Sequence, residues 1–170
     1  PLLQSIGLND CRNSLFERLY KQSKEDFRSI LHKQGRMHPA ISEFPNQTFY
    51  YREQLEPVPL PHQEECLPYA SAPAPQDNLD KLIQSRRMVF IPADAPDNLA
   101  YSEKTNINEA RIVAALLERI YRMTSGTFDA YKTVGVIVPY RNQIAMIRRE
   151  IARKGIPELA HISIDTVERY

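Results

Sequence analysis

The sequence has few of the residues from which self-contained catalytic or metal sites are built. Only 5 of its 170 residues are glycine, and it contains neither a G-x-x-x-x-G-K-[ST] nor a G-x-G-x-x-G phosphate-binding loop. Its two cysteines, Cys11 and Cys66, are far apart, and its 4 histidines have no metal-ligand spacing. We therefore expect no disulfide and no metal site. Taken alone, the chain is not a complete enzyme.

Long hydrophobic runs and an excess of one charge are also missing. No apolar run approaches the roughly 20 residues that span a bilayer, and the N-terminal segment lacks the pattern of a signal peptide. We therefore expect a reduced, cytoplasmic setting and no membrane partner. With 22 basic and 21 acidic residues the net charge is +1, so nucleic-acid binding must come from a local arrangement. The chain starts at Pro1 and not at Met, and it stops at Tyr170 directly after a strand-like run, so we interpret it as a cut from a longer protein.

Apolar periodicity predicts the elements of the N-terminal half. A helix is expected from about Asp10 to Gln22, with Asn9 or Asp10 as its cap. A strand is expected around Ile30 and Leu31. A short helix should follow at His38 to Phe44, and Pro45 should interrupt it.

The C-terminal half alternates between β-branched runs and amphipathic segments. The expected elements are a strand at Arg87–Ile91, a helix from Asn106 to about Met123, a strand at Thr133–Pro139 buried on both faces, a helix at Asn142–Lys154 and a strand at His161–Thr166. Six of the 13 prolines lie between Pro57 and Pro75, so we expect a long irregular insertion at about residues 56–86. The alternation predicts an α/β fold with a parallel sheet and helices on its faces. Ligands of such sheets bind at the carboxyl ends of the strands, here Pro139–Gln143 and Asp165–Arg169.

Three segments carry a more specific pattern. The first is S-L-F-E-R-L at Ser14–Leu19 followed by Q-G-R-M-H-P-A-I-S-E-F-P-N at Gln34–Asn46. The others are V-G-V-I-V-P-Y-R-N-Q at Val134–Gln143 and I-D-T-V-E-R-Y at Ile164–Tyr170. In order and spacing they resemble motif IV, the V-I-T-P-Y-x-x-Q segment and motif V of superfamily 1 helicases, in the nonsense-mediated-decay and replication-helicase branch.

The resemblance implies that residues 1–170 form a second RecA-like motor domain, the second lobe of a P-loop NTPase, truncated within motif V and with helices on both faces of its sheet. ATP and Mg²⁺ would be cofactors of the intact parent, held mainly by a missing first lobe of the same polypeptide. Arg36 matches the motif IV arginine that reaches the γ-phosphate, where a fixed guanidinium neutralises developing charge. The same motif implies that Gln34, Gly35 and Arg36 bind the ATP cofactor, and that Gln34, which begins it, positions the loop. Gly35 stands where the family usually has an aromatic residue that can stack on adenine.

The resemblance also implies a binding surface for single-stranded DNA or RNA. Its residues would be Pro139, Tyr140, Arg141, Gln143, Thr166 and Val167. Tyr140 offers a ring for stacking, Arg141 a charge for phosphates, and Gln143 and Thr166 polar contacts to the strand.

Simpler interpretations and other functions stay open at this point. Tyr140 is equally compatible with a half-buried aromatic at a sheet edge, and His38 with a residue that fixes a turn. The chain as a whole could be a non-catalytic α/β module that recruits nucleic acid or protein. It could also be an accessory module of a nuclease complex. A phosphate loop upstream and Q-G-x-E downstream would favour the motor.

Overall fold

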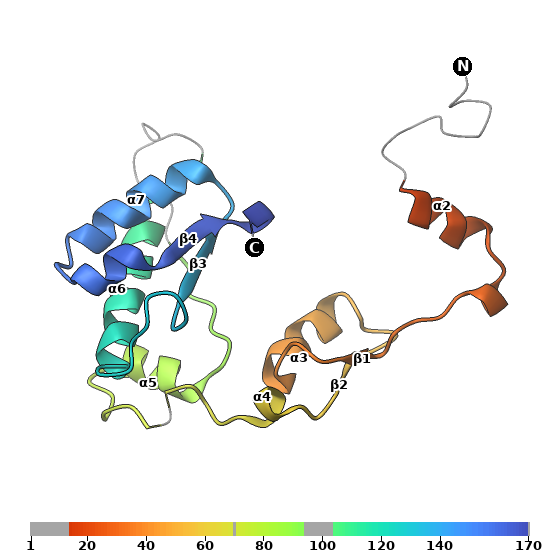
Figure 1. Ribbon diagram of the computed structural model, residues 1–170, viewed down its shortest axis with the longest axis horizontal. Coiled ribbons are helices and arrows are strands. Elements are labelled where there is room, and N and C mark those ends of the chain that lie inside the picture. Colours follow the sequence, from red (N-terminus) through yellow and green to blue (C-terminus); the bar gives the residue numbers. More distant parts are fainter. Residues whose placement is uncertain (1–13, 70, 94–103, 170) are drawn as a thin grey trace, which may run out of the picture. The chain divides into compact units, whose positions relative to one another are not determined.

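The computed structural model describes residues 14–69, 71–93 and 104–169 (Figure 1). The chain divides into two compact units, Pro1–Glu64 and Glu65–Tyr170. Each unit contains one pair of parallel strands, which confirms the α/β class predicted from the sequence. Among the described helices, none has the length and apolar character needed to cross a membrane.

The first unit is built around a β-α-β arrangement. Its elements are α2 (Leu15–Gln22), the 3₁₀ helix η1 (Glu25–Phe27), β1 (Lys33–Gln34), α3 (Pro39–Thr48), β2 (Glu56–Pro57) and α4 (Pro61–Glu64). The two strands pair in parallel with Lys33 opposite Glu56, and α3 connects them (Figure 1). Asn46 closes the connection, because its amide exchanges two hydrogen bonds of 2.8 and 3.0 Å with the backbone of Leu55.

Three predictions for this unit need correction. Helix α2 begins at Leu15, where Ser14 accepts a hydrogen bond from the N–H of Glu17 as its cap; Asn9 and Asp10, the predicted caps, lie outside the described residues. The strand predicted at Ile30 and Leu31 lies instead at Lys33–Gln34, where β2 supplies a partner.

The third correction concerns the helix predicted to stop before Pro45. Helix α3 runs through Pro45 to Thr48. Proline removes one backbone donor, but its carbonyl group still accepts hydrogen bonds from the N–H groups of Phe49 (2.8 Å) and Tyr50 (3.0 Å). These bonds keep the last turn of the helix closed.

The second unit holds the longer elements. They are α5 (Asn78–Ser85), α6 (Ile107–Met123), β3 (Gly135–Val138), α7 (Arg141–Ala152), the 3₁₀ helix η2 (Pro157–His161), β4 (Ser163–Thr166) and the 3₁₀ helix η3 (Val167–Arg169). Strands β3 and β4 are parallel, with Gly135 opposite Ser163 and Val138 opposite Thr166, and α7 is the crossover between them. The order helix, strand, helix, strand predicted from the sequence is confirmed here.

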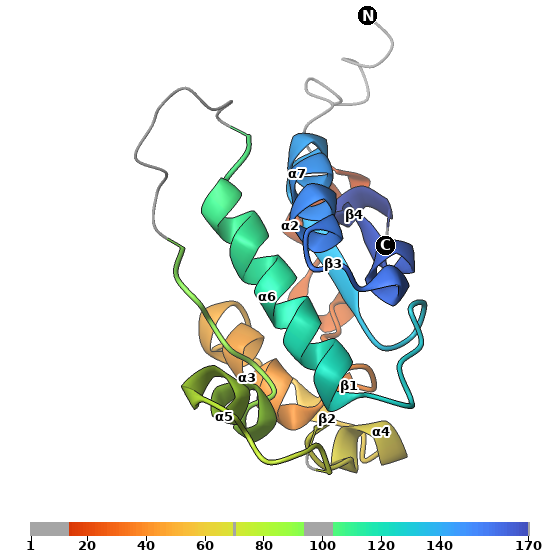
Figure 2. The ribbon, with the colours of Figure 1, turned by 90° about the vertical axis from the view of Figure 1, so that its left-hand side faces the viewer.

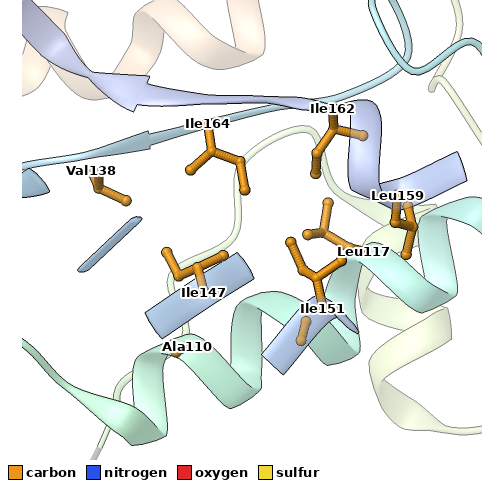
Figure 3. Close-up of a cluster of buried hydrophobic side chains, with 9 residues drawn as sticks. Ala110, Leu117, Val138, Ile147, Ile151, Leu159, Ile162 and Ile164 are labelled. Atoms are coloured by element: carbon orange, nitrogen blue, oxygen red, sulfur yellow. The ribbon is translucent and has the colours of Figure 1, made fainter. Parts of the chain in front are cut away.

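The core of this unit lies between the strand pair and two helices that run side by side (Figure 2). Figure 3 shows Val138, Ile162 and Ile164 facing Leu117, Ile147 and Ile151 across it. The buried side chains that α6 contributes to this cluster are Ala110, Ala114 and Leu117, which have the spacing of one helix face. Complete burial of an isoleucine or leucine contributes about 1.5–3 kcal/mol, so this cluster carries much of the stability.

Strand β3 is not buried on both faces as predicted. Val138 is buried, but Ile137 on the opposite face is 56% exposed. The reason is that α6 and α7 pack on the side of the strand pair that carries Val138 and Ile164, so only one face is covered among the described residues. The predicted helices on the second face are therefore not seen in this part of the chain.

Two other segments differ from prediction. Residues 86–93 form no strand, although their side chains alternate between partly buried and exposed. Val89 and Ile91 line a cavity of about 320 Å³ together with residues of α6 and β3, so the segment contacts the sheet without pairing with it. The insertion expected to be irregular at residues 56–86 contains β2, α4 and α5.

A charged cluster attaches α5 to α6. The Asp80 carboxylate, 1% exposed, accepts hydrogen bonds from Arg119 (2.6 Å), from Arg122 and from the N–H of Gln76 (3.0 Å). Burial alone would raise the pKa of Asp80, but the Gln76 N–H and the two guanidinium groups outweigh it and hold that pKa below its usual value. Asp77 caps α5 and also pairs with Arg119. The proline-rich segment is thus anchored to the core at this point.

Candidate functional site

The first candidate site is the loop Gln34–Met37, which we call the Arg36 loop. It lies between the end of β1 and the start of α3. The side-chain oxygen of Gln34 accepts hydrogen bonds from the N–H groups of Arg36 (3.0 Å) and Met37 (2.7 Å), and its amide donates to the carbonyl of Met37 (2.8 Å). Through these bonds the Gln34 side chain holds its own loop. A site at the carboxyl end of a parallel strand is the usual place for a ligand in this fold class.

Helix α3 begins directly after this loop. His38 is its cap, and Nδ1 of His38 accepts a hydrogen bond of 3.1 Å from the N–H of Ala40. Pro39 occupies the first helical position, where its missing N–H costs nothing. His38 therefore fixes the turn, as the simpler interpretation of the sequence held.

Arg36 is exposed at the tip of the loop. Within the described parts of the chain, its guanidinium group has no hydrogen bond and no ion pair. Gly35 is exposed beside it, and a Cβ at this position would stand 3.3 Å from Cδ1 of Leu60. The Leu60 side chain would therefore have to shift slightly to admit a larger residue at position 35.

The second candidate site lies at the carboxyl ends of β3 and β4. A pocket of about 320 Å³ opens there, lined by Lys104, Pro139, Tyr140, Arg141, Asn142, Thr166 and Glu168. We call these residues the rim pocket. Four of the six residues predicted to bind nucleic acid, Pro139, Tyr140, Arg141 and Thr166, therefore line one cavity. Val167 is 67% exposed next to it at the start of η3.

Charges of both signs surround the rim pocket. Nζ of Lys104 lies 5.7 Å from the centre of the Tyr140 ring, a distance suited to a cation–π contact. Asp165 accepts hydrogen bonds from the N–H of Thr166 (2.9 Å) and from Arg169 (3.0 Å). These bonds, with the more distant charge of Arg141, lower the pKa of Asp165, so its carboxylate stays ionised and holds Arg169 near the end of β4.

Gln143 differs from the other predicted rim residues. Its side chain is 4% exposed and bonds to the start of α6. The side-chain oxygen accepts from the N–H of Asn106 (2.9 Å), and the amide donates to the Asn106 carbonyl (2.8 Å) and to Glu109 (3.4 Å). In this structure Gln143 holds the rim in place and does not present its amide at the surface.

Sequence reasoning placed Asn142 and Glu168 within the rim segments Pro139–Gln143 and Asp165–Arg169 but gave them no contact, and it missed Lys104. Asn142 stands inside the P-Y-R-N-Q segment, but nothing in its pattern sets it apart. Helix α6 and strand β3 separate Lys104 from Tyr140 in the sequence, so the two residues come together only in the folded chain.

Nearly the whole chain is similar to one family of known proteins. The AAA domain family AAA_12 matches residues 11–170. The chain belongs to this family. It is the C-terminal helicase lobe of the superfamily 1 Upf1-like helicases and part of such a motor.

Curated relatives of this lobe include two proteins named helicases and one named a regulator of nonsense transcripts. "DNA polymerase alpha-associated DNA helicase A" of Schizosaccharomyces pombe is 32% identical over 91% of this chain. "Regulator of nonsense transcripts 1 homolog" of Arabidopsis thaliana is 30% identical over 84%, and "Helicase SEN1" of Saccharomyces cerevisiae is 29% identical over 82%. The chain spans 23%, 10% and 6% of the lengths of these relatives, respectively.

The family implies ATP and Mg²⁺ in the parent protein. The Arg36 loop fits contact with a triphosphate, because it offers an exposed cation on a backbone that internal hydrogen bonds hold rigid. Among the residues that the structure describes, no three His, Cys, Asp or Glu side chains gather in a way that could hold a metal ion.

Proposed function

We propose that this chain is the second lobe of an ATP-driven motor that binds single-stranded DNA or RNA. In this proposal a first lobe of the same polypeptide holds ATP and supplies most ligands of Mg²⁺. The Arg36 loop closes over the phosphates from the other side. The rim pocket binds the strand, and a cytoplasmic setting is part of the same proposal.

The observation that carries this proposal is the state of Arg36. Arg36 is exposed at the tip of its loop, and its guanidinium group has no partner in the described residues. At the same time, its backbone N–H is held by Gln34. A free cation on a fixed support is the arrangement expected of a group that meets an anion from elsewhere.

Bound ATP would supply the phosphoryl group whose transfer to water drives the motor. Negative charge then spreads over the phosphoryl oxygens, and a guanidinium group neutralises it with two parallel donors. Because the Arg36 loop is already ordered, little reorganisation is needed at the moment of reaction. In comparable phosphoryl-transfer enzymes such an arginine is worth about 10³–10⁵ in rate.

The rim pocket would bind the strand without reading its sequence. Tyr140 offers a ring on which a base can stack, and Arg141 and Lys104 offer charges for phosphates. Glu168 would repel phosphates, so we expect the backbone of the strand on the side of the two cations. Thr166 adds a polar contact, Val167 an apolar one, and Gln143 holds the rim in position. Closure of the lobes on ATP would shift these contacts, and hydrolysis would release them.

The test uses the full-length protein with Arg36→Ala. We expect the rate of ATP turnover to fall by a factor of 10² or more, while affinity for single strands changes less than about threefold. Arg36→Lys should restore only a small part of the rate, because an ammonium group lacks the planar fork. Arg52→Ala is the matched control, since Arg52 is also exposed in the first unit but only faces the Tyr51 ring.

Other outcomes point to the competing functions. Equal losses of turnover and strand affinity in Arg36→Ala would mean that Arg36 is structural. A full-length protein that binds strands but hydrolyses no ATP would instead be a non-catalytic binding module. Strand affinity should be measured with both DNA and RNA, since one relative is named a DNA helicase and another a regulator of nonsense transcripts.

A further inference from the structure

Helix α4, in the proline-rich segment, contacts the Arg36 loop through the side chain of Gln63. This side chain is 1% exposed, although glutamine is normally a surface residue. Its amide donates hydrogen bonds to the carbonyl groups of Gln34 (3.0 Å) and Met37 (2.9 Å). Its oxygen accepts one from the N–H of Leu60 (3.3 Å). Every polar atom of the buried amide is therefore in use.

The neighbouring residue on α4 completes the contact. Nε2 of His62 donates a hydrogen bond of 2.8 Å to the carbonyl of Gly35. Together, His62 and Gln63 hold the carbonyl groups of Gln34, Gly35 and Met37, the residues on both sides of Arg36. The Gln34 side chain holds the N–H groups of Arg36 and Met37 from the other direction.

The residue before α4 explains the glycine in the loop. Cδ1 of Leu60 would lie 3.3 Å from a Cβ at residue 35, a tighter contact than almost all side chains make. Gly35 thus leaves room for the side chain of Leu60, which lies three residues before Gln63. The loop and α4 fit each other as a unit.

We propose that Gln63 is the positioning residue of Arg36 and that His62 assists it. This inference rests on the proposed role of Arg36 in ATP turnover. Gln63 touches no phosphate in this scheme; it fixes the backbone that carries the guanidinium group. The part of the chain that composition marks as a linker therefore belongs to the ATP site.

A positioning role predicts a specific kinetic effect. Loss of the Gln63 amide would let the loop sample several conformations, so Arg36 would reach the phosphoryl oxygens in only a fraction of closed states. A displacement of about 1 Å can cost on the order of 10²-fold in rate. We expect Gln63→Leu to lower kcat for ATP 10- to 100-fold and to change KM and single-strand affinity less than threefold.

The decisive measurement is a double-mutant comparison in the full-length protein. If Gln63 acts through Arg36, Gln63→Leu combined with Arg36→Ala should be no slower than Arg36→Ala alone. If the kcat losses of the two single variants multiply in the double variant, Gln63 supports the fold generally and the proposal is overturned. Gln47→Leu, an exposed glutamine on α3 that bonds only to Glu43, is the matched control and should leave kcat unchanged.

Further variants separate the remaining outcomes. His62→Ala removes one exposed hydrogen bond and should fold even if Gln63→Leu does not. The proposal is supported if His62→Ala lowers kcat severalfold in the wild-type protein but has no further effect when combined with Arg36→Ala. A normal kcat in both Gln63→Leu and His62→Ala would refute it. A normal kcat in Arg36→Ala would instead refute the proposed function itself.

Discussion

The side-chain oxygen of Gln143 accepts a hydrogen bond of 2.9 Å from the N–H of Asn106, and its amide returns one of 2.8 Å to the carbonyl of the same residue. Asn106 is the cap of α6, and Gln143 lies in the first turn of α7. This reciprocal pair joins the starts of the two helices. It also explains why Lys104, two residues before Asn106, lies beside the Tyr140 ring.

The first prediction concerns the stability of this junction. Gln143→Leu keeps the side-chain volume but leaves the N–H and carbonyl of Asn106 without their partner. An unsatisfied buried polar group costs about 1–3 kcal/mol, and we expect the free energy of unfolding of the 170-residue chain to fall by that amount in urea titrations. Asn142→Ala, at the exposed neighbouring position, should change it by less than about 0.5 kcal/mol. Equal effects of the two variants would contradict the proposed junction.

The second prediction separates stacking from charge in the rim pocket. Arg141→Ala in the full-length protein should reduce the salt dependence of single-strand binding by about 0.7 in the slope of log K against log salt concentration, the value for one phosphate contact. Tyr140→Ala should weaken binding by about 1–3 kcal/mol and leave that slope unchanged. Arg149→Ala, on the exposed face of α7 beside Glu150, is the control and should alter neither quantity. If Arg149→Ala and Arg141→Ala change the slope equally, the rim pocket is not the binding surface.

The third prediction concerns pH and the buried carboxylate of Asp80. The pKa of Asp80 in the folded chain lies below its value in the unfolded chain, about 3.9. Between the two values the unfolded state binds more protons, so the carboxylate stabilises the fold above pH 4 and this contribution is lost as the pH falls. We expect Asp80→Asn to be clearly less stable than wild type at pH 7, and the difference to shrink at pH 3. Denaturant titrations at both pH values measure it, with Asp26→Asn, at an exposed position, as the control. A pH-independent difference would mean that lost packing dominates.

Much of the second unit follows from local signals in the sequence. Asn106 and the apolar spacing that follows it predicted α6 with its cap, and the structure shows Asn106 accepting from the N–H groups of Asn108 and Glu109. The order of strands and helices predicted parallel pairing. Parallel pairing in turn brings Tyr140 and Thr166 to the same edge, because both follow the carboxyl ends of strands.

What local signals could not predict depends on partners elsewhere in the chain. Residues 87–91 have the alternation of a strand, but a strand also needs a neighbouring edge at hydrogen-bonding distance, which sequence does not reveal. Gln143 has a polar side chain that could contact a ligand. Because the start of α6 lies next to it, the side chain instead forms hydrogen bonds within the protein. The proline-rich segment did contain missed signals. Pro61 suits the first turn of a helix, and Asp77 caps α5.

The two parallel strand pairs have a consequence for how this lobe can change over evolution. In each pair the first strand ends in a short loop that leads directly into the connecting helix, α3 after the Arg36 loop and α7 after Tyr140. Both ends of each loop are therefore anchored by elements whose stability does not depend on the exposed side chains between them. We therefore expect substitutions of the exposed side chains of Arg36 and Tyr140 to affect binding more than folding. The binding properties of this lobe could thus change by substitution at the loops, without rebuilding the scaffold.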